Sequence, residues 1–248
     1  RGQTYMTVLA VISAMRIEEL LDIRTERTPA KPFVTSEDEQ YTYREVQERS
    51  KQYANALAAL GVETGDRVAL FLPNCPEFLF CMFGNAYRDS VTAPSNPEYT
   101  AGELAHSLEL SAPTVLVTTP ELAATAREAA DGTTVDRILT TEPTDDHDAL
   151  PALADEQGSD VAPHDGTEET IGLHMYTSGT TGPPKAVECQ HENWTISAID
   201  FQKRMGFTYE DTLFTALPLF HANAQIYSTL GAAAAGAEVV IYESFSTS

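Results

Sequence analysis

The chain has 248 residues, 42% of them hydrophobic, so it can bury the core of one large domain or of two ordinary ones. Its 37 acidic residues against 15 lysines and arginines give a net charge of −22, and such a field repels phosphate backbones, which argues against nucleic acid as a partner. Three cysteines (Cys75, Cys81 and Cys189) without a C-x-x-C pair argue against a disulfide framework or a zinc site and favour the cytoplasm.

Residues 1–15 are expected to be an extension that is disordered or foreign to the native protein. The apolar run at 6–15 is too short to span a bilayer, and no signal-peptide cleavage site follows it, so we expect no membrane span. The first strong element starts at Thr42, which forms a capping box with Glu45 and predicts a helix. Gly61 is placed to end that helix in the left-handed conformation.

Strand-like and helical patterns then alternate. Residues 67–72 are a short apolar run typical of a buried strand, and residues 77–87 are apolar almost all round, as in a helix packed on a sheet. A second capping box, Thr100 with Glu103, starts another helix, and residues 114–118 predict the next strand. This alternation indicates βαβ crossovers, so the predicted class is α/β with mainly parallel strands.

Residues 141–170 are rich in Asp, Glu, Pro, Thr and Gly, and they predict an acidic surface connection. It separates a first α/β half, residues 16–140, from a second half, residues 171–248. In the second half we expect strands at 171–176, 213–217 and 238–242 and a helix at 193–205.

The most informative segment is residues 176–185, which read Tyr-Thr-Ser-Gly-Thr-Thr-Gly-Pro-Pro-Lys. Glycines let the backbone turn its amides toward an anion, hydroxyl groups add donors, and a lysine adds positive charge. The segment therefore predicts a phosphate-binding loop formed by Thr177, Ser178, Gly179, Thr180, Thr181, Gly182 and Lys185. It is not a Walker A loop, because Pro184 precedes the lysine and Ala186 follows it.

This loop resembles the phosphate-binding signature of the adenylate-forming superfamily, which includes acyl-CoA synthetases, peptide-synthetase adenylation domains and firefly luciferase. Residues 41–46, Asn96-Pro97 with the helix start at Thr100, and residues 217–221 resemble three further motifs, in the family's order. Residues 74–81 are similar to a segment of carnitine- and crotonobetaine-CoA ligases. The resemblance covers residues 17–248 and implies a layered αβαβα core that forms part of the family's N-terminal domain.

The resemblance also implies a reaction. ATP converts a carboxylic acid to an acyl-adenylate with release of pyrophosphate, and CoA then takes the acyl group, as in fatty acid metabolism. The implied cofactors are ATP, Mg²⁺ and CoA as co-substrate. Residues 177–182 would wrap the phosphates, Lys185 would neutralise them, and His221 would line the acyl pocket, so Lys185 and His221 are the expected catalytic residues. Asn223 and Gln225 are candidates to line the same pocket.

Several family features are missing from residues 1–248: the adenine and ribose motifs, the Mg²⁺-binding glutamate, the hinge and the C-terminal lysine. Ala186 also stands where the family usually has glycine. The chain is therefore expected to be a truncated N-terminal fragment, inactive alone. Two alternatives stay open: a non-catalytic module that binds phosphate or a partner, and an amino-acid-activating adenylation domain.

No metal site is expected. His174 and His191 flank the loop but have no carboxylate or cysteine at ligand spacing. The expected partners are thus a small carboxylic acid, ATP and CoA, and the sequence is compatible with a homo-oligomer. The acidic residues are spread along the whole chain, a composition that molar salt would screen, so we hypothesise a halophilic source.

Overall fold

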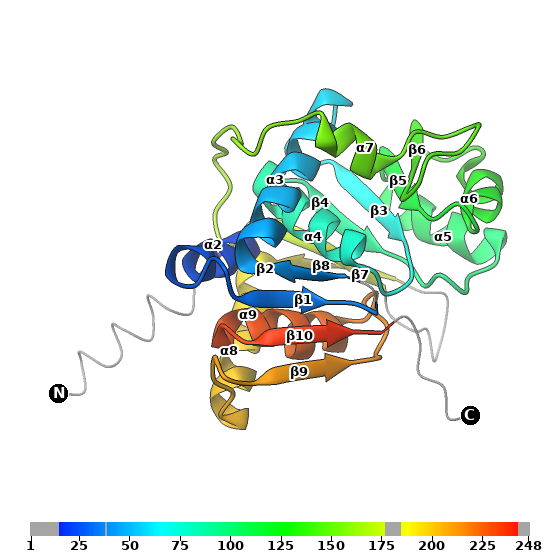
Figure 1. The fold of residues 1–248 in the computed structure, drawn as a ribbon. Coiled ribbons are helices and arrows are strands. Elements are labelled where there is room, and N and C mark those ends of the chain that lie inside the picture. The colour runs from blue at the N-terminus through cyan, green and yellow to red at the C-terminus, as the bar shows by residue number, and fades with distance from the viewer. Residues whose placement is uncertain (1–14, 38, 177–184, 243–248) are drawn as a thin grey trace.

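The computed structural model describes residues 15–37, 39–176 and 185–242. Their strands form two sheets (Figure 1). The smaller sheet has the order β2 (Gln40–Thr42), β1 (Pro32–Thr35), β10 (Glu238–Ile241) and β9 (Thr212–Thr215). The larger has the order β6 (Arg137–Thr140), β5 (Val115–Thr118), β3 (Arg67–Phe71), β4 (Val91–Pro94), β7 (Ile171–Tyr176) and β8 (Ala186–Gln190).

Both sheets are mainly parallel, which confirms the predicted class. The antiparallel pairs are β1 with β2 and β7 with β8, and each lies at one end of its sheet. The strands also interleave along the sequence: β1 pairs with β10, and β7 pairs with β4. Each sheet therefore takes strands from both sides of the segment 141–170.

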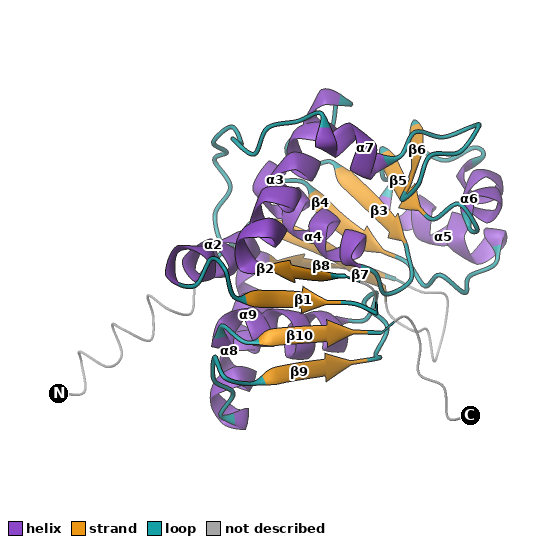
Figure 2. Ribbon diagram, in the orientation of Figure 1, coloured by secondary structure: helices purple, strands orange, loops and turns teal. Residues whose placement is uncertain are grey.

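Helices cover the sheets in layers (Figure 2). The helices are α2 (Ile17–Arg27), α3 (Tyr43–Ala59), α4 (Pro76–Arg88), α5 (Ala101–Ser111), α6 (Ala123–Ala130), α7 (Leu150–Asp155), α8 (His191–Met205), the π-helix η1 (Ala224–Leu230) and α9 (Gly231–Ala235). Strand β3 shows the layering, because Val68 and Leu70 pack in the core that contains α3 and α4, whereas Ala69 and Phe71 pack against α5 and α6.

The smaller sheet closes the stack. Phe33 of β1 stacks on Tyr43 of α3 with ring centroids 4.4 Å apart and contacts Phe83 of α4. Helices α8 and α9 lie behind β9 and β10 in Figure 2. The order of layers is thus α5 and α6, the larger sheet, α3 and α4, the smaller sheet, then α8 and α9, which confirms the αβαβα core.

Both predicted capping boxes are present. Thr42 accepts a hydrogen bond from the backbone of Glu45 at the start of α3, and Thr100 does the same with Glu103 at α5. Gly61 has a φ of 93°, as its place after α3 requires. The segment 141–170, predicted as an acidic surface connection, contains the short helix α7, which buries Leu150 and Ala154. The strand predicted to reach residue 217 ends at Thr215.

Candidate active site

A cavity of about 650 Å³ lies at the carboxyl ends of strands from both sheets. Leu72 follows β3, Asn96 follows β4, Thr119 follows β5, and Ala216 follows β9 of the smaller sheet. Ligands of open α/β sheets bind at such an edge, and the volume suits a small organic molecule. The remaining lining residues are Pro73, Asn74, Pro97, Glu98, Glu121, Leu122, Pro218, Phe220 and His221.

His221 reaches this cavity from the loop between β9 and η1. The backbone N–H of His221 donates to the carbonyl oxygen of Pro218 at 3.0 Å, which closes a tight turn. The imidazole is exposed and lies against the ring of Phe220, with centroids 4.1 Å apart. The loop thus places a hydrogen-bonding ring in the cavity wall, and the role of His221 toward an acyl group stays a prediction.

The predicted phosphate-binding segment follows the end of β7 in the sequence. The hydroxyl of Tyr176 lies within hydrogen-bonding distance of Ser111 Oγ, at 2.8 Å, and of the carbonyl oxygen of Ser107, at 3.1 Å, so the carboxyl end of β7 is anchored on α5. Burial raises the pKa of Tyr176 to about 12, so this phenol stays a neutral donor at physiological pH.

Lys185 stands at the other end of that loop. Strand β8 begins at Ala186, directly opposite Tyr176, so the exposed Lys185 lies beside the carboxyl end of β7. It is not among the residues that line the cavity. The other predicted phosphate-binding residues, Thr177, Ser178, Gly179, Thr180, Thr181 and Gly182, lie outside the described residues, and their role stays a prediction.

Gln225 does not line the cavity, so this expectation was wrong. Its side chain is completely buried, accepts a hydrogen bond from Trp194 Nε1 at 3.0 Å and donates to the carbonyl oxygen of Leu219 at 2.8 Å. Asn223 is exposed and is also not a lining residue. Gln225 instead supports the loop that carries His221.

Four polar lining residues escaped the sequence analysis: Asn74, Glu98, Thr119 and Glu121. The two glutamates read as ordinary surface carboxylates in so acidic a chain. Their position just beyond the ends of β4 and β5 is the signal that could have found them, since side chains that follow parallel strands meet at one edge of the sheet.

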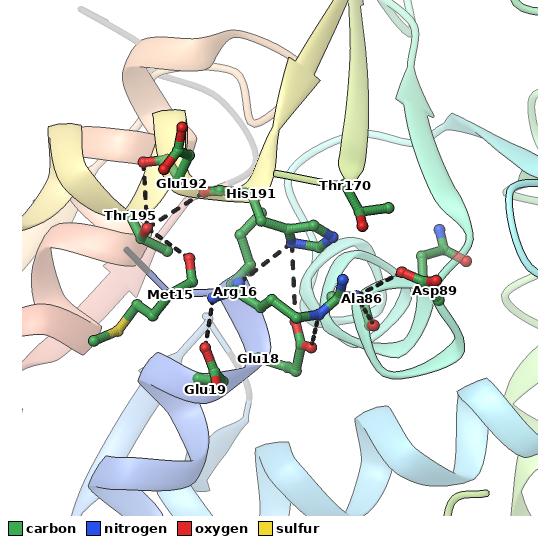
Figure 3. Close-up of polar contacts among 12 residues, drawn as sticks. Met15, Arg16, Glu18, Glu19, Ala86, Asp89, Thr170, His191, Glu192 and Thr195 are labelled. Carbon is green, nitrogen blue, oxygen red and sulfur yellow. Dashed lines mark hydrogen bonds and ion pairs between the residues drawn. The ribbon is translucent and has the colours of Figure 1, made fainter. Parts of the chain in front are cut away.

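His191 takes part in a buried ionic cluster (Figure 3). Arg16 forms ion pairs with Glu18 and with Asp89, the latter at 2.9 Å. His164 Nε2 lies 3.6 Å from Glu18 Oε1, and His191 Nδ1 accepts a hydrogen bond from the backbone of Ile17 at 3.3 Å. The cluster joins the start of α2, the end of α4 and the start of α8.

Burial is the main reason that the pKa of His191 falls to about 4, so the ring is neutral at pH 7. The ring also lies against Gly172 near the amino end of β7, whereas the cavity lies at the carboxyl ends of the neighbouring strands. We conclude that the cluster stabilises the packing of α2. No group of three or more potential metal ligands occurs among the residues that the structure describes.

Comparison with known proteins places this architecture in a family. The family model of AMP-binding enzymes matches residues 21–248, and the chain belongs to this family. The chain is 32% identical over 214 residues to crotonobetaine/carnitine–CoA ligase of Escherichia coli, a match that covers 83% of this chain and 41% of that protein. The chain thus spans about two fifths of the length of this curated relative.

Solved structures agree with the fold. The anthranilate CoA ligase AuaEII, determined with anthranoyl-AMP, superposes with a TM-score of 0.89 at 20% identity, over 94% of this chain and 46% of that one. The N-terminal domain of FACL13 from Mycobacterium tuberculosis superposes with a TM-score of 0.84 at 27% identity, over 94% of this chain and 58% of that one. In the described part of this chain, no helix is long and apolar enough to cross a membrane.

Proposed function

We propose that this chain is part of an acyl-CoA ligase that activates a carboxylic acid with ATP, releases pyrophosphate and transfers the acyl group to CoA. The observation that carries the proposal is the cavity that lies at the carboxyl ends of strands from both sheets. His221 lies in its wall, and the predicted phosphate-loop segment follows the neighbouring β7. The family membership supports it. Because the chain spans 41% of its relative's length, we assign the activity to a protein of that length and expect residues 1–248 alone to be inactive.

The proposed roles follow from charge. A carboxylate is a poor electrophile, and adenylation removes its charge and supplies a leaving group. Residues 177–182 bind the β- and γ-phosphates of ATP, which arrives with Mg²⁺, and Lys185 neutralises the charge that moves onto pyrophosphate. His221 positions the acid in the cavity. The cysteine content supports a cytoplasmic location.

The substrate class is a small or medium carboxylic acid. Crotonobetaine and carnitine, the substrates in the name of the E. coli relative, fit this description and head the test panel. Anthranilate and a long-chain fatty acid complete it, because structural neighbours are ligases of these acids.

Acid-dependent exchange of labelled pyrophosphate into ATP tests the first half-reaction, and formation of an acyl-CoA thioester tests the second. The assay uses the protein that carries this sequence. We expect both signals with at least one acid of the panel. Exchange driven by amino acids without a CoA thioester would instead establish an adenylation domain, and phosphate binding without any exchange would establish a non-catalytic module.

A further inference from the structure

Asn74 joins the two sheets at the edge where the cavity lies. It follows β3 in the larger sheet and is only 9% exposed. Its Nδ2 donates to the carbonyl oxygens of Leu217 at 3.0 Å and of Tyr242 at 2.9 Å, which follow β9 and β10 in the smaller sheet. Its Oδ1 accepts from the backbone N–H of Leu219 at 2.6 Å.

These three bonds require an amide. A carboxamide carries two donor hydrogens and an acceptor oxygen, whereas a carboxylate of the same shape only accepts. Aspartate at position 74 would place negative charge against the carbonyl oxygens of Leu217 and Tyr242. The geometry therefore explains why position 74 carries an asparagine. The proposed roles of the phosphate loop and of His221 do not explain this residue.

The loop before His221 is held from both sides through Leu219. Asn74 binds the N–H of Leu219, and Gln225 binds its carbonyl oxygen at 2.8 Å. Gln225 is fixed in turn by Trp194 of α8, and the side chain of Leu219 is 1% exposed. Both peptide groups of Leu219 are thus fixed. The hydrogen bond between His221 N–H and the carbonyl oxygen of Pro218 closes the turn that contains Leu219 and presents His221.

We propose that Asn74 is a positioning residue that sets the place of His221 in the cavity wall through the backbone of Leu219. The inference rests on the proposed function, in which His221 positions the acid. Asn74 itself lines the cavity, but its amide hydrogens and oxygen are engaged by the protein backbone, so its effect passes through the loop.

The kinetic test uses Asn74→Asp in the acid-dependent exchange assay. Since a displacement of about 1 Å can cost about 100-fold in rate, we expect kcat/KM for the acid to fall about 10- to 100-fold. The KM for the acid should rise and the KM for ATP should change by less than about twofold, whereas a loss of folded protein would lower kcat alone. Asn74→Ser adds no charge and replaces Asn74→Asp should that variant not fold.

A double-mutant cycle with His221→Ala separates positioning from general damage. In that background the effect of Asn74→Asp should shrink to less than about threefold. Asn55→Asp is the matched control: this half-buried amide also donates to two carbonyl oxygens, those of Gly158 at 2.7 Å and Asp160 at 3.0 Å, but it does not line the cavity. Equal losses in both backgrounds, or an equal loss in Asn55→Asp, would overturn the inference.

Hydrogen exchange gives a second readout that needs no activity. In Asn74→Ala the amide of Leu219 loses its acceptor, so a peptide covering residues 217–223 should exchange at least about 10-fold faster than in the parent protein. Asn55→Ala should leave this peptide unchanged. An unchanged hydrogen-exchange rate of this peptide in Asn74→Ala would overturn the inference, even in a protein that shows no ligase activity. If the parent protein does not exchange pyrophosphate into ATP, the proposed function alone is refuted.

Discussion

His191 Nδ1 lies 3.9 Å from Glu18 Oε2, and both side chains are at least 96% buried. Arg16, Asp89 and His164 are the other charged or titratable groups of this cluster. An imidazole so enclosed by protein is kept neutral by its surroundings although acidic groups adjoin it, because the loss of solvation outweighs their attraction.

Stability should fall on mild acidification. The pKa of His191 is about 4 in the fold against 6.5 when unfolded, so between these values only the unfolded chain binds the proton. This lowers the free energy of unfolding by about 2 kcal/mol from pH 7 to pH 5. Urea denaturation across this range measures it. The His191→Gln variant should show a smaller dependence of the free energy of unfolding on pH. The His147→Gln variant, which changes a histidine outside the cluster, should keep the parental dependence.

Protonation of Glu18 should also lower the free energy of unfolding, at a lower pH than protonation of His191. Burial alone raises its pKa, but the contact with His164 and the charge of Arg16 outweigh burial and hold the pKa below 4.5. Its contribution to stability is therefore present above pH 4.5 and is lost as the pH falls through the lowered value. A midpoint of urea unfolding that stays constant from pH 7 to pH 4.5 would contradict the assignment for His191, and one that falls no further as the pH is lowered below 4.5 would contradict that for Glu18.

Gly172→Ala should destabilise the fold. A Cβ at this position would lie 2.8 to 3.0 Å from three atoms of the His191 ring, so the buried imidazole or β7 would have to move. Overpacking of this kind costs about 1–3 kcal/mol. Gly102→Ala is the control, because its Cβ would meet open space in α5, where alanine is about 1 kcal/mol better than glycine. Equal urea midpoints for the two variants would refute the close contact.

Lys185→Ala should abolish most of the acid-dependent exchange while leaving the fold intact, because the lysine is exposed. Loss of one charge-stabilising group at a reacting centre costs about 100- to 1,000-fold in rate. Lys203→Ala removes the same side chain from the last turn of α8 and should leave exchange unchanged. A Lys185→Ala protein with parental exchange would remove this residue from the mechanism.

Salt should stabilise the protein. The net charge of −22 is self-repulsive in dilute buffer, and about 1 M salt shortens the Debye length to about 3 Å. We expect the thermal midpoint to rise as KCl increases from 0.1 to 2 M and the chain to unfold on dialysis to low salt. A midpoint independent of KCl would contradict a halophilic source.

The long regular elements were predictable from the sequence because their signals are local. Capping boxes at Thr42 and Thr100 and the apolar run of β3 define segments without reference to the rest of the chain. The strands that were missed, β1, β2, β4, β6 and β8, have only three to five residues each, too few for a clear alternation. Helix α2 was missed because its buried Glu18 reads as a surface residue.

The site was predictable only in part. The loop motif and His221 could be proposed from the sequence because their residue order is distinctive, whereas the hydrogen bonds of Asn74 join it to partners 143 to 168 positions away. Gln225 was misplaced for the same reason: its two hydrogen-bonding partners, Trp194 and Leu219, come from other elements. A polar side chain alone does not show whether it faces solvent, a ligand or distant backbone.

The interleaving of strands also orders events during synthesis. Thr35 of β1 and Glu238 of β10 share a hydrogen bond although 203 positions separate them, so β1 has no parallel neighbour until β10 has left the ribosome. The hydroxyl of Tyr43 donates to the carbonyl oxygen of Ala237 at 2.6 Å, so this hydrogen bond also cannot form before Ala237 has left the ribosome. Of the two sheets that the structure describes, the smaller is therefore expected to close later, and β1 keeps one edge unpaired, and open to aggregation, until β10 is available.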